Sequence, residues 1–153
     1  MIMKSIKKLQ IGQLDRKMAD YLTMPDIPSH GWIHGIRTAM NMSFRQLAKR
    51  LQITPQSAHH MEKREMDGSI TLKSLRDAAD AMNMKLVYGF VPRAGSIEKT
   101  INEQTVAVAR KIVMRTDTTM KLEDQAVSYG QIEKSVKELA EEIKQEMPRY
   151  LWD

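Results

Sequence analysis

The second of two short helical patterns near the middle of the chain carries side chains that suit contact with nucleic acid. From Thr54-Pro55 onward, Ala58 and Met61 fall on one side of a helix in which successive residues are about 100° apart. The other side is wholly polar and contains Gln56, His59, His60 and Lys63. Glutamine, serine and histidine can meet base edges or phosphates. Every surface helix has a polar face, so an assignment to DNA depends on the surrounding charges.

The charges around this face are mostly positive. The nearby cations are Arg45, Lys49, Arg50, Lys63 and Arg64. Between Trp32 and Glu65, the only acidic residues are Glu62 and Glu65 itself. A basic surface of this kind favours a polyanionic partner.

Two capping signals predict the elements that position these residues. Ser43, followed three residues later by Gln46, is a capping box that satisfies two otherwise unpaired amide groups. Thr54 can cap the next helix, and Pro55 suits its first turn because the amide that proline lacks would have no partner there. Two helices joined by a turn of about three residues match the helix-turn-helix motif, whose second helix enters the major groove of DNA.

The composition restricts the alternatives. The chain has 153 residues, enough for a self-supporting core, and no cysteine, which excludes a disulfide framework and a thiolate zinc site. No apolar run approaches the roughly 20 residues that cross a bilayer, so we expect a cytoplasmic protein without a membrane segment. Residues 1–92 carry 14 Lys and Arg against 8 Asp and Glu, whereas residues 93–153 carry 10 against 11. We therefore expect nucleic-acid binding in the first part, and packing or protein contact in the second.

The remaining pattern predicts a mainly α protein. It contains 13 methionines, few aromatic residues and few β-branched runs, which favours helices. Helical patterns occupy residues 9–22, 32–42, 44–51, 55–64, 71–82, 96–115 and 129–147. We divide the chain into an N-terminal helix and linker (1–29), a helix-turn-helix domain (30–84), a strand (85–92) and a C-terminal helical region (93–153).

The sequence predicts one strand, at residues 85–92, because this segment is rich in β-branched and aromatic side chains. Its apolar residues are Leu86, Val87, Tyr88 and Phe90. A single strand cannot satisfy its own backbone donors and acceptors, so we expect it to pair with its copy in a second subunit. Such a homodimer would present two reading helices to a pseudo-palindromic operator in double-stranded DNA.

Other clusters give weaker signals. The candidates are the histidines His30, His34, His59 and His60 and the carboxylate pairs Glu123-Asp124 and Glu141-Glu142. No third ligand sits at a supporting spacing, so we expect no metal site. No histidine lies near the carboxylate pairs in sequence, and no nucleophile elbow, P-loop or dinucleotide fingerprint occurs. We expect a binding protein without a cofactor rather than an enzyme.

Residues 32–82 resemble the lambda-repressor-like, or XRE-type, helix-turn-helix domain. The matching positions are Ser43, Leu47, Ala48, Leu51, Ile53, Thr54, Ala58, Glu62 and the segment from Thr71-Leu72 to Ala79. Nearly the whole chain is similar to the bacterial "mobile mystery protein A" family. The segments that carry this likeness are Gly31-Trp32-Ile33, Leu47-Ala48-Lys49-Arg50-Leu51, Glu62-Lys63-Arg64-Glu65, Gly68-Ser69-Ile70-Thr71-Leu72, Leu86-Val87-Tyr88, Leu122-Glu123-Asp124-Gln125 and Leu151-Trp152-Asp153.

The resemblance implies roles for individual residues. It implies that the helix from Ser43 touches phosphates with its N-terminal end and that Pro55, Gln56, Ser57, His59 and His60 face the groove. From these positions and the surrounding charges we predict base reading by Gln56, Ser57, His59 and His60, and phosphate contacts by Ser43, Arg45, Lys49, Lys63 and Arg64. The chain departs from the XRE pattern at Phe44 and Pro55, where glutamine often stands, which favours Gln56 as a direct reader together with Ser57. Glu62 is expected to be structural and to hold the helices together through an arginine such as Arg37.

Members of the second family are typically encoded beside a Fic-domain protein. This implies a toxin-antitoxin-like or regulatory pairing. The sequence thus predicts a DNA-binding transcriptional regulator that autoregulates an operon shared with a Fic-domain protein. The alternative is an antitoxin-like interaction protein that binds a Fic-domain partner through its C-terminal helices.

Overall fold

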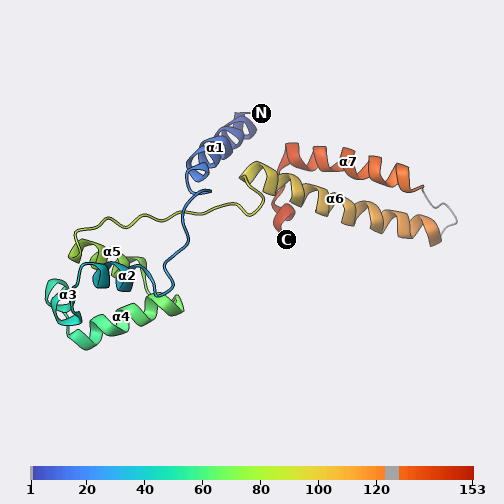
Figure 1. Cartoon of the computed structure of the whole chain (residues 1–153). Helices are drawn as coiled ribbons and strands as arrows, with labels where there is room; N and C mark the ends of the chain where they lie inside the picture. The colour runs from blue at the N-terminus through green and yellow to red at the C-terminus, as the bar shows by residue number, and fades with distance from the viewer. Residues whose placement is uncertain (1, 123–127) are drawn as a thin grey trace. The chain divides into compact units, whose positions relative to one another are not determined.

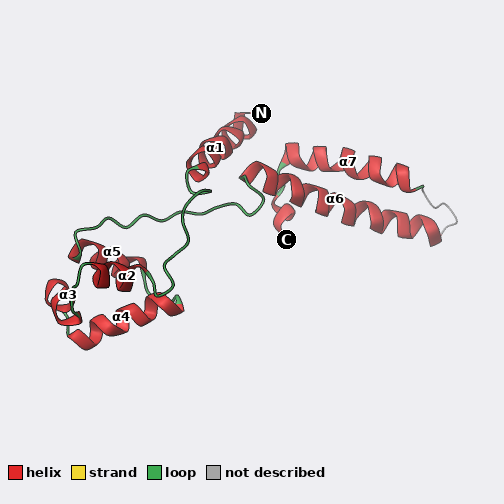
Figure 2. Ribbon diagram, viewed as in Figure 1, coloured by secondary structure: helices red, strands yellow, loops and turns green. Residues whose placement is uncertain are grey.

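The chain is mainly helical (Figures 1 and 2). The computed structural model describes residues 2–122 and 128–153, and the side chains of residues 4–118 and 128–153. Its elements are α1 (Ile2–Ala19), α2 (Trp32–Ala39), α3 (Phe44–Leu51), α4 (Pro55–Asp67), α5 (Leu72–Ala81), α6 (Ile97–Leu122), α7 (Tyr129–Glu146) and the short 3₁₀ helix η1 (Arg149–Trp152). The prediction of a mainly α class is confirmed. The carboxylate pair Glu123-Asp124 lies outside the described residues.

The chain forms two compact units. The central unit comprises Pro25–Tyr88, and the terminal unit combines Met1–Met24 with Gly89–Asp153. Helices α2 to α5 belong to the central unit, whereas α1, α6, α7 and η1 belong to the terminal unit. In the sequence, the central unit therefore lies between the two segments that form the terminal unit.

Local capping determines where the helices of the central unit begin. The Ser43 hydroxyl accepts a hydrogen bond from the Gln46 amide, and the Gln46 side chain accepts one from the Ser43 amide, which completes the predicted capping box of α3. Thr54 and Thr71 cap α4 and α5 in the same way, each accepting from an amide three residues later. Gly68 adopts φ 81° and ends α4, a conformation that glycine enters without steric cost.

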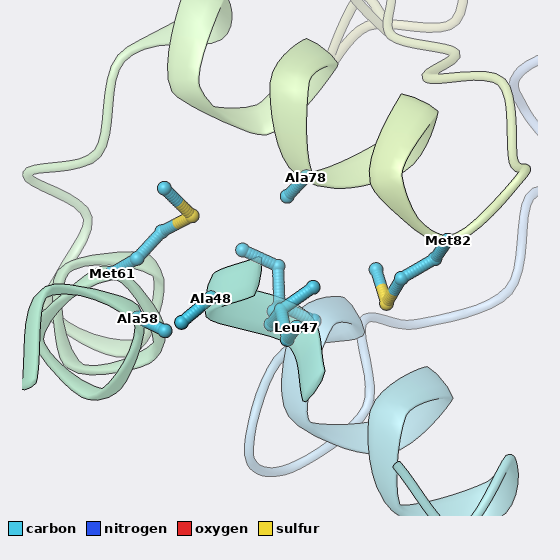
Figure 3. Close-up of a cluster of buried hydrophobic side chains, with 7 residues drawn as sticks. Leu47, Ala48, Ala58, Met61, Ala78 and Met82 are labelled. Atoms are coloured by element: carbon cyan, nitrogen blue, oxygen red, sulfur yellow. The ribbon is translucent and has the colours of Figure 1, made fainter. Parts of the chain in front are cut away.

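The core of the central unit lies between the inner faces of these four helices. Its buried members are Ile33, Leu47, Ala48, Ala58, Met61, Ala78 and Met82, and Figure 3 labels all but the first. The small side chains Ala48 and Ala58 come from α3 and α4, so the two helices of the predicted motif can approach closely. These contacts support the predicted buried faces of both helices.

The terminal unit is built on the long antiparallel pair α6 and α7, which lie side by side in Figure 1. Their buried seam consists of Ile101, Ala109, Ile132, Val136, Ala140 and Ile143, and Leu151 of η1 joins it. Helix α1 packs against α6, and the Asp15 carboxylate accepts hydrogen bonds from the amides of Ile97 and Glu98 at 2.6 and 3.3 Å. Asp15 thus satisfies two of the amide groups that every helix leaves unpaired at its start.

The predicted strand at residues 85–92 is wrong. Residues 2–122 and 128–153 contain no β-strand, and residues 85–91 make no backbone hydrogen bond to any other described residue. A strand needs a paired neighbour, and the prediction assigned that role to a second subunit. Within the described chain, whose elements are helices, nothing pairs with these residues. Of the strand's apolar residues, Leu86 is half-buried, Val87 and Tyr88 are exposed, and Phe90 is 81% exposed.

Candidate nucleic-acid interface

A tight turn sets the position of α4 relative to α3. Gln52 ends α3 in the left-handed conformation at φ 58°, and the Ile53 amide donates to the Ala48 carbonyl at 3.0 Å. Thr54 then caps α4 at once. Three residues, Gln52 to Thr54, therefore connect the two helices, as the sequence predicts for a helix-turn-helix motif.

A buried ion pair joins α2 to α4. The Nε atom of Arg37 donates to Oε1 of Glu62 at 2.5 Å, and the two residues are only 7% and 6% exposed. The same guanidinium donates through Nη1 to the Met42 carbonyl at 2.8 Å, just before α3, and His34 Nδ1 lies 3.1 Å from Glu62 Oε2. The expectation that Glu62 holds the helices together through Arg37 is confirmed. Because both charges are buried, loss of either partner would leave the other uncompensated.

A second glutamate of α4 caps α2, a role that sequence reasoning missed. Glu65 Oε2 accepts from the Trp32 amide and Oε1 from the Ile33 amide, both at 2.8 Å. The N-cap residue of α2 is Gly31, which has no side chain to satisfy these amides. The available signal was the spacing of Glu62 and Glu65, because residues three apart share one helix face.

The four predicted base-reading residues all lie on the exposed side of α4. Gln56, Ser57, His59 and His60 are exposed, whereas Ala58 and Met61 beside them are buried. The Thr54 hydroxyl lies 2.9 Å from that of Ser57 and also accepts from the Ser57 amide at 3.1 Å. Ser57 is thereby held at the start of the helix, with its side chain toward solvent.

The predicted phosphate-contacting cations belong to the same two helices, α3 and α4. Arg45, Lys49, Lys63 and Arg64 are all exposed, and none of them forms a salt bridge within 4.0 Å among the residues that the structure describes. Ser43 differs because its hydroxyl oxygen already caps α3, so only its proton is available to another acceptor. Arg50 also has a structural contact, since its Nη1 donates to the Ala81 carbonyl at the end of α5.

One aromatic contact links α3 to the exposed side of α4, and a cation–π contact links α2 to α3. The Phe44 and His59 ring centroids lie 5.1 Å apart with an interplanar angle of 71°, an edge-to-face arrangement. The Arg37 guanidinium carbon lies 3.8 Å from the Phe44 ring centroid. Phe44 therefore contacts His59 on one side and, on another, the guanidinium of the buried Arg37–Glu62 pair.

The turn after α4 is fixed by a short polar contact. The Ser69 hydroxyl and amide both donate to Asp67 Oδ1, at 2.5 and 2.8 Å. These two hydrogen bonds lower the pKa of the Asp67 carboxyl, and Arg64 nearby lowers it further. Asp67 is consequently an anion at neutral pH and lies at the far end of α4 from Gln56.

The histidines and carboxylates assemble no metal centre among the residues that the structure describes. The His30 and His34 rings are 5.3 Å apart, but His30 Nδ1 contacts the Ser29 hydroxyl at 3.0 Å and His34 Nδ1 contacts Glu62. Within residues 2–122 and 128–153, no helix is long and apolar enough to cross a membrane.

Comparisons with protein-family models, with curated proteins and with solved structures gave no match to this chain. The family resemblances therefore stay predictions from the quoted residues.

Proposed function

We propose that this chain is a homodimeric transcriptional regulator that binds DNA with sequence specificity. In this proposal the protein acts in the cytoplasm. The observation that carries the proposal is the exposed polar face of α4, which a three-residue turn holds next to α3, together with the exposed cations of both helices. In this proposal Gln56, Ser57, His59 and His60 read bases, and the cations Arg45, Lys49, Lys63 and Arg64 anchor the phosphates. Ser43 donates its hydroxyl proton to a further phosphate.

Binding is tested with the purified chain and a selected pool of random duplexes, followed by titration of the preferred duplex in fluorescence anisotropy. We expect a pseudo-palindromic site, found near the gene of the chain itself if the regulator controls its own operon. Affinity falls steeply with salt, because each neutralised phosphate contributes a slope of about −0.9 in log affinity against log salt concentration. Equal binding to a scrambled duplex, or a flat salt response, contradicts the proposal.

Two substitutions separate base reading from phosphate anchoring. Gln56→Ala costs about 1–3 kcal/mol on the preferred duplex and relaxes the preference at one base pair. Arg45→Ala weakens binding to all duplexes alike and reduces the salt slope by about one unit. Lys73→Ala is the matched control, because Lys73 is an exposed cation of α5 that pairs with Asp77 and lies outside the proposed face. If Gln56→Ala and Arg45→Ala behave alike on every sequence, the proposed orientation is wrong.

The proposed dimer contact is the apolar segment of residues 86–91. Val87, Tyr88, Phe90 and Val91 are all exposed, although such side chains are usually covered in a soluble protein. A second copy of the same segment would cover them and would place two copies of α4 on one duplex. Phe90→Ser should convert a dimer to a monomer in size-exclusion chromatography with light scattering. Tyr129→Ser, at a side chain that is 78% exposed, is the control. A wild-type monomer at micromolar concentration overturns this assignment.

A groove on the α6 and α7 pair favours a second candidate function, binding of a Fic-domain protein in an antitoxin-like manner. The groove has a volume of about 320 Å³, and Thr105, Val136 and Ala140 lie along it between charged side chains that include Lys137 and Glu141. If a Fic-domain protein is encoded beside the gene, its co-purification with this chain tests this function. Lys137→Glu should abolish co-purification and leave DNA affinity unchanged. Retention of the partner by this variant counts against the groove.

A further inference from the structure

The side chain of Phe44 is an apolar group at the edge of a surface otherwise made of polar side chains. Phe44 is the first residue of α3 and follows the Ser43 cap. Its ring is half-buried: one part packs on the core of the central unit, and it also meets the exposed His59. A polar side chain at the start of a helix would meet water or phosphate more favourably, so a ring here requires an explanation.

The surroundings of the ring fix its orientation. Arg37 lies 3.8 Å from the ring centroid, and this guanidinium is itself fixed by Glu62 and by the Met42 carbonyl. On another side, the His59 ring packs edge to face at 5.1 Å. Phe44 and His59 thus form one rigid aromatic pair across the junction of α3 and α4, and we call it the aromatic pair below.

The chemistry of the major groove limits what such a pair can recognise. Base pairs present donors and acceptors there, and the one apolar group among them is the C5-methyl group of thymine. A phenylalanine ring has no hydrogen-bonding atom, so it cannot distinguish bases through their donors or acceptors. It can gain only by removing apolar surface from water, and the thymine methyl group supplies such surface.

We propose that the aromatic pair recognises the C5-methyl group of a thymine in the bound duplex. This inference rests on the proposed DNA-binding function and adds a specificity that hydrogen bonds from the polar residues of α4 do not supply. Arg37 acts as a positioning residue, because it holds the Phe44 ring without lying on the exposed face.

Replacement of thymine by deoxyuridine tests the inference, since it removes the methyl group and leaves every hydrogen-bonding atom of the base in place. Each thymine of the preferred duplex is replaced singly, and the affinity of the whole chain is measured by anisotropy. At one thymine in each half-site, we expect the wild type to bind about fourfold more weakly, the effect of losing one buried methyl group. The other replacements should leave the affinity within twofold.

Variants of the aromatic pair assign the effect to these residues. Phe44→Gln should bind the thymine and deoxyuridine duplexes equally, whereas Phe44→Leu should keep part of the preference. If Phe44→Gln does not fold because the ring also packs on the core, His59→Ala replaces it, since the His59 side chain is exposed. His59→Ala should reduce the preference as well. Lys73→Ala, outside the face, should retain the full fourfold difference.

The outcomes separate this inference from the proposed function. If the wild type prefers its selected duplex over a scrambled one but no deoxyuridine replacement weakens it, the aromatic pair does not read thymine and DNA binding stands. A fourfold effect that persists in both Phe44→Gln and His59→Ala also overturns the inference, because another residue then reads the methyl group. If no duplex is preferred over a scrambled one, both the proposed function and the inference fail.

Discussion

The two units of this chain hold their helices together by different means. In the central unit, directional polar contacts cross between helices: the Arg37–Glu62 pair is buried, and Glu65 caps α2. In the terminal unit, a long apolar seam joins α6 to α7, and the ion pairs Arg110–Glu133, Lys134–Glu138 and Lys144–Glu98 lie at the surface. The Arg37–Glu62 pair therefore joins two helices from a buried position, whereas these three ion pairs of the terminal unit lie at its surface.

Helix length explains the difference. Helices α2 and α3 have eight residues each, so each can bury only a short apolar stripe. Helices α6 and α7 have 26 and 18 residues, and their seam extends over several turns. Short helices that must keep a defined orientation need contacts that depend on direction, which hydrogen bonds supply and apolar packing does not.

The chain contains two tryptophans, one in each unit, so the unfolding of each unit can be followed by fluorescence. Trp32 belongs to the central unit and Trp152 to the terminal unit. Trp152→Phe leaves a fluorophore that reports on the central unit, and Trp32→Phe leaves one for the terminal unit. The variants below are made in these two backgrounds and unfolded with urea.

Glu62→Ala should have the largest effect. It leaves the Arg37 guanidinium buried without its partner, which lowers the free energy of unfolding of the central unit by about 3–5 kcal/mol. Trp32 fluorescence should show the shift, and Trp152 fluorescence should not. The double variant with Arg37→Met should recover part of the loss, because no unpaired charge then remains. A loss below 1 kcal/mol in Glu62→Ala would mean that the pair does not hold α2 to α4.

Glu65→Ala should have the next largest effect. It removes a charged acceptor from the amides of Trp32 and Ile33, and hydrogen bonds to charged groups contribute about 1.5–3 kcal/mol. The urea midpoint reported by Trp32 measures the loss. Lys63→Ala, an exposed neighbour on α4, serves as the control and should leave the midpoint unchanged. Equal midpoints in the two variants would show that the α2 cap contributes nothing.

Asp15→Ala examines a polar contact in the terminal unit. It removes the cap that α1 provides to the start of α6, and a lost helix cap costs about 1 kcal/mol. Trp152 fluorescence should report the change. Asp20→Ala, in the turn after α1, is the matched control. If Asp15→Ala affects the terminal unit as strongly as Glu62→Ala affects the central one, the contrast between the units fails.

Arg110→Ala should have the smallest effect. The Arg110–Glu133 pair is exposed, so solvent screens it and Trp152 should report almost no change at pH 7. The hydrogen bond from Arg110 lowers the pKa of Glu133 in the folded state. A carboxyl whose pKa is depressed by folding stabilises above its unfolded pKa and loses that contribution as the pH falls. Any difference between wild type and variant should thus vanish in acid, and a difference that grows in acid contradicts this assignment.

The sequence predicted the local features of the central unit well. The Ser43 and Thr54 caps depend on residues three apart, so they are visible in the sequence and are confirmed. The Arg37–Glu62 contact was also predicted. Glu65 and Asp15 were missed because each binds backbone amides far away in the sequence, and an amide carries no residue signature. The spacing of Glu62 and Glu65 indicated a shared helix face but not the amides that Glu65 caps.

The strand prediction failed for a related reason. Side-chain composition favoured an extended segment at residues 85–92, but a strand also needs a pairing partner, and composition says nothing about one. For the candidate interface, helical periodicity correctly predicted that Gln56, His59 and His60 are exposed. Periodicity cannot identify what they bind, so contact with DNA stays a prediction.

The insertion of the central unit has a consequence for synthesis on the ribosome. Helix α1 emerges first, yet the Ile97 amide that Asp15 caps is made 82 residues later. At about 5–20 residues per second, this separation corresponds to about 4–16 s. The core of the central unit lies entirely within residues 25–88 and can form during that interval, whereas α1 must wait for α6. In the nascent chain, the central unit, with the exposed face of α4, can therefore fold before the terminal unit is complete.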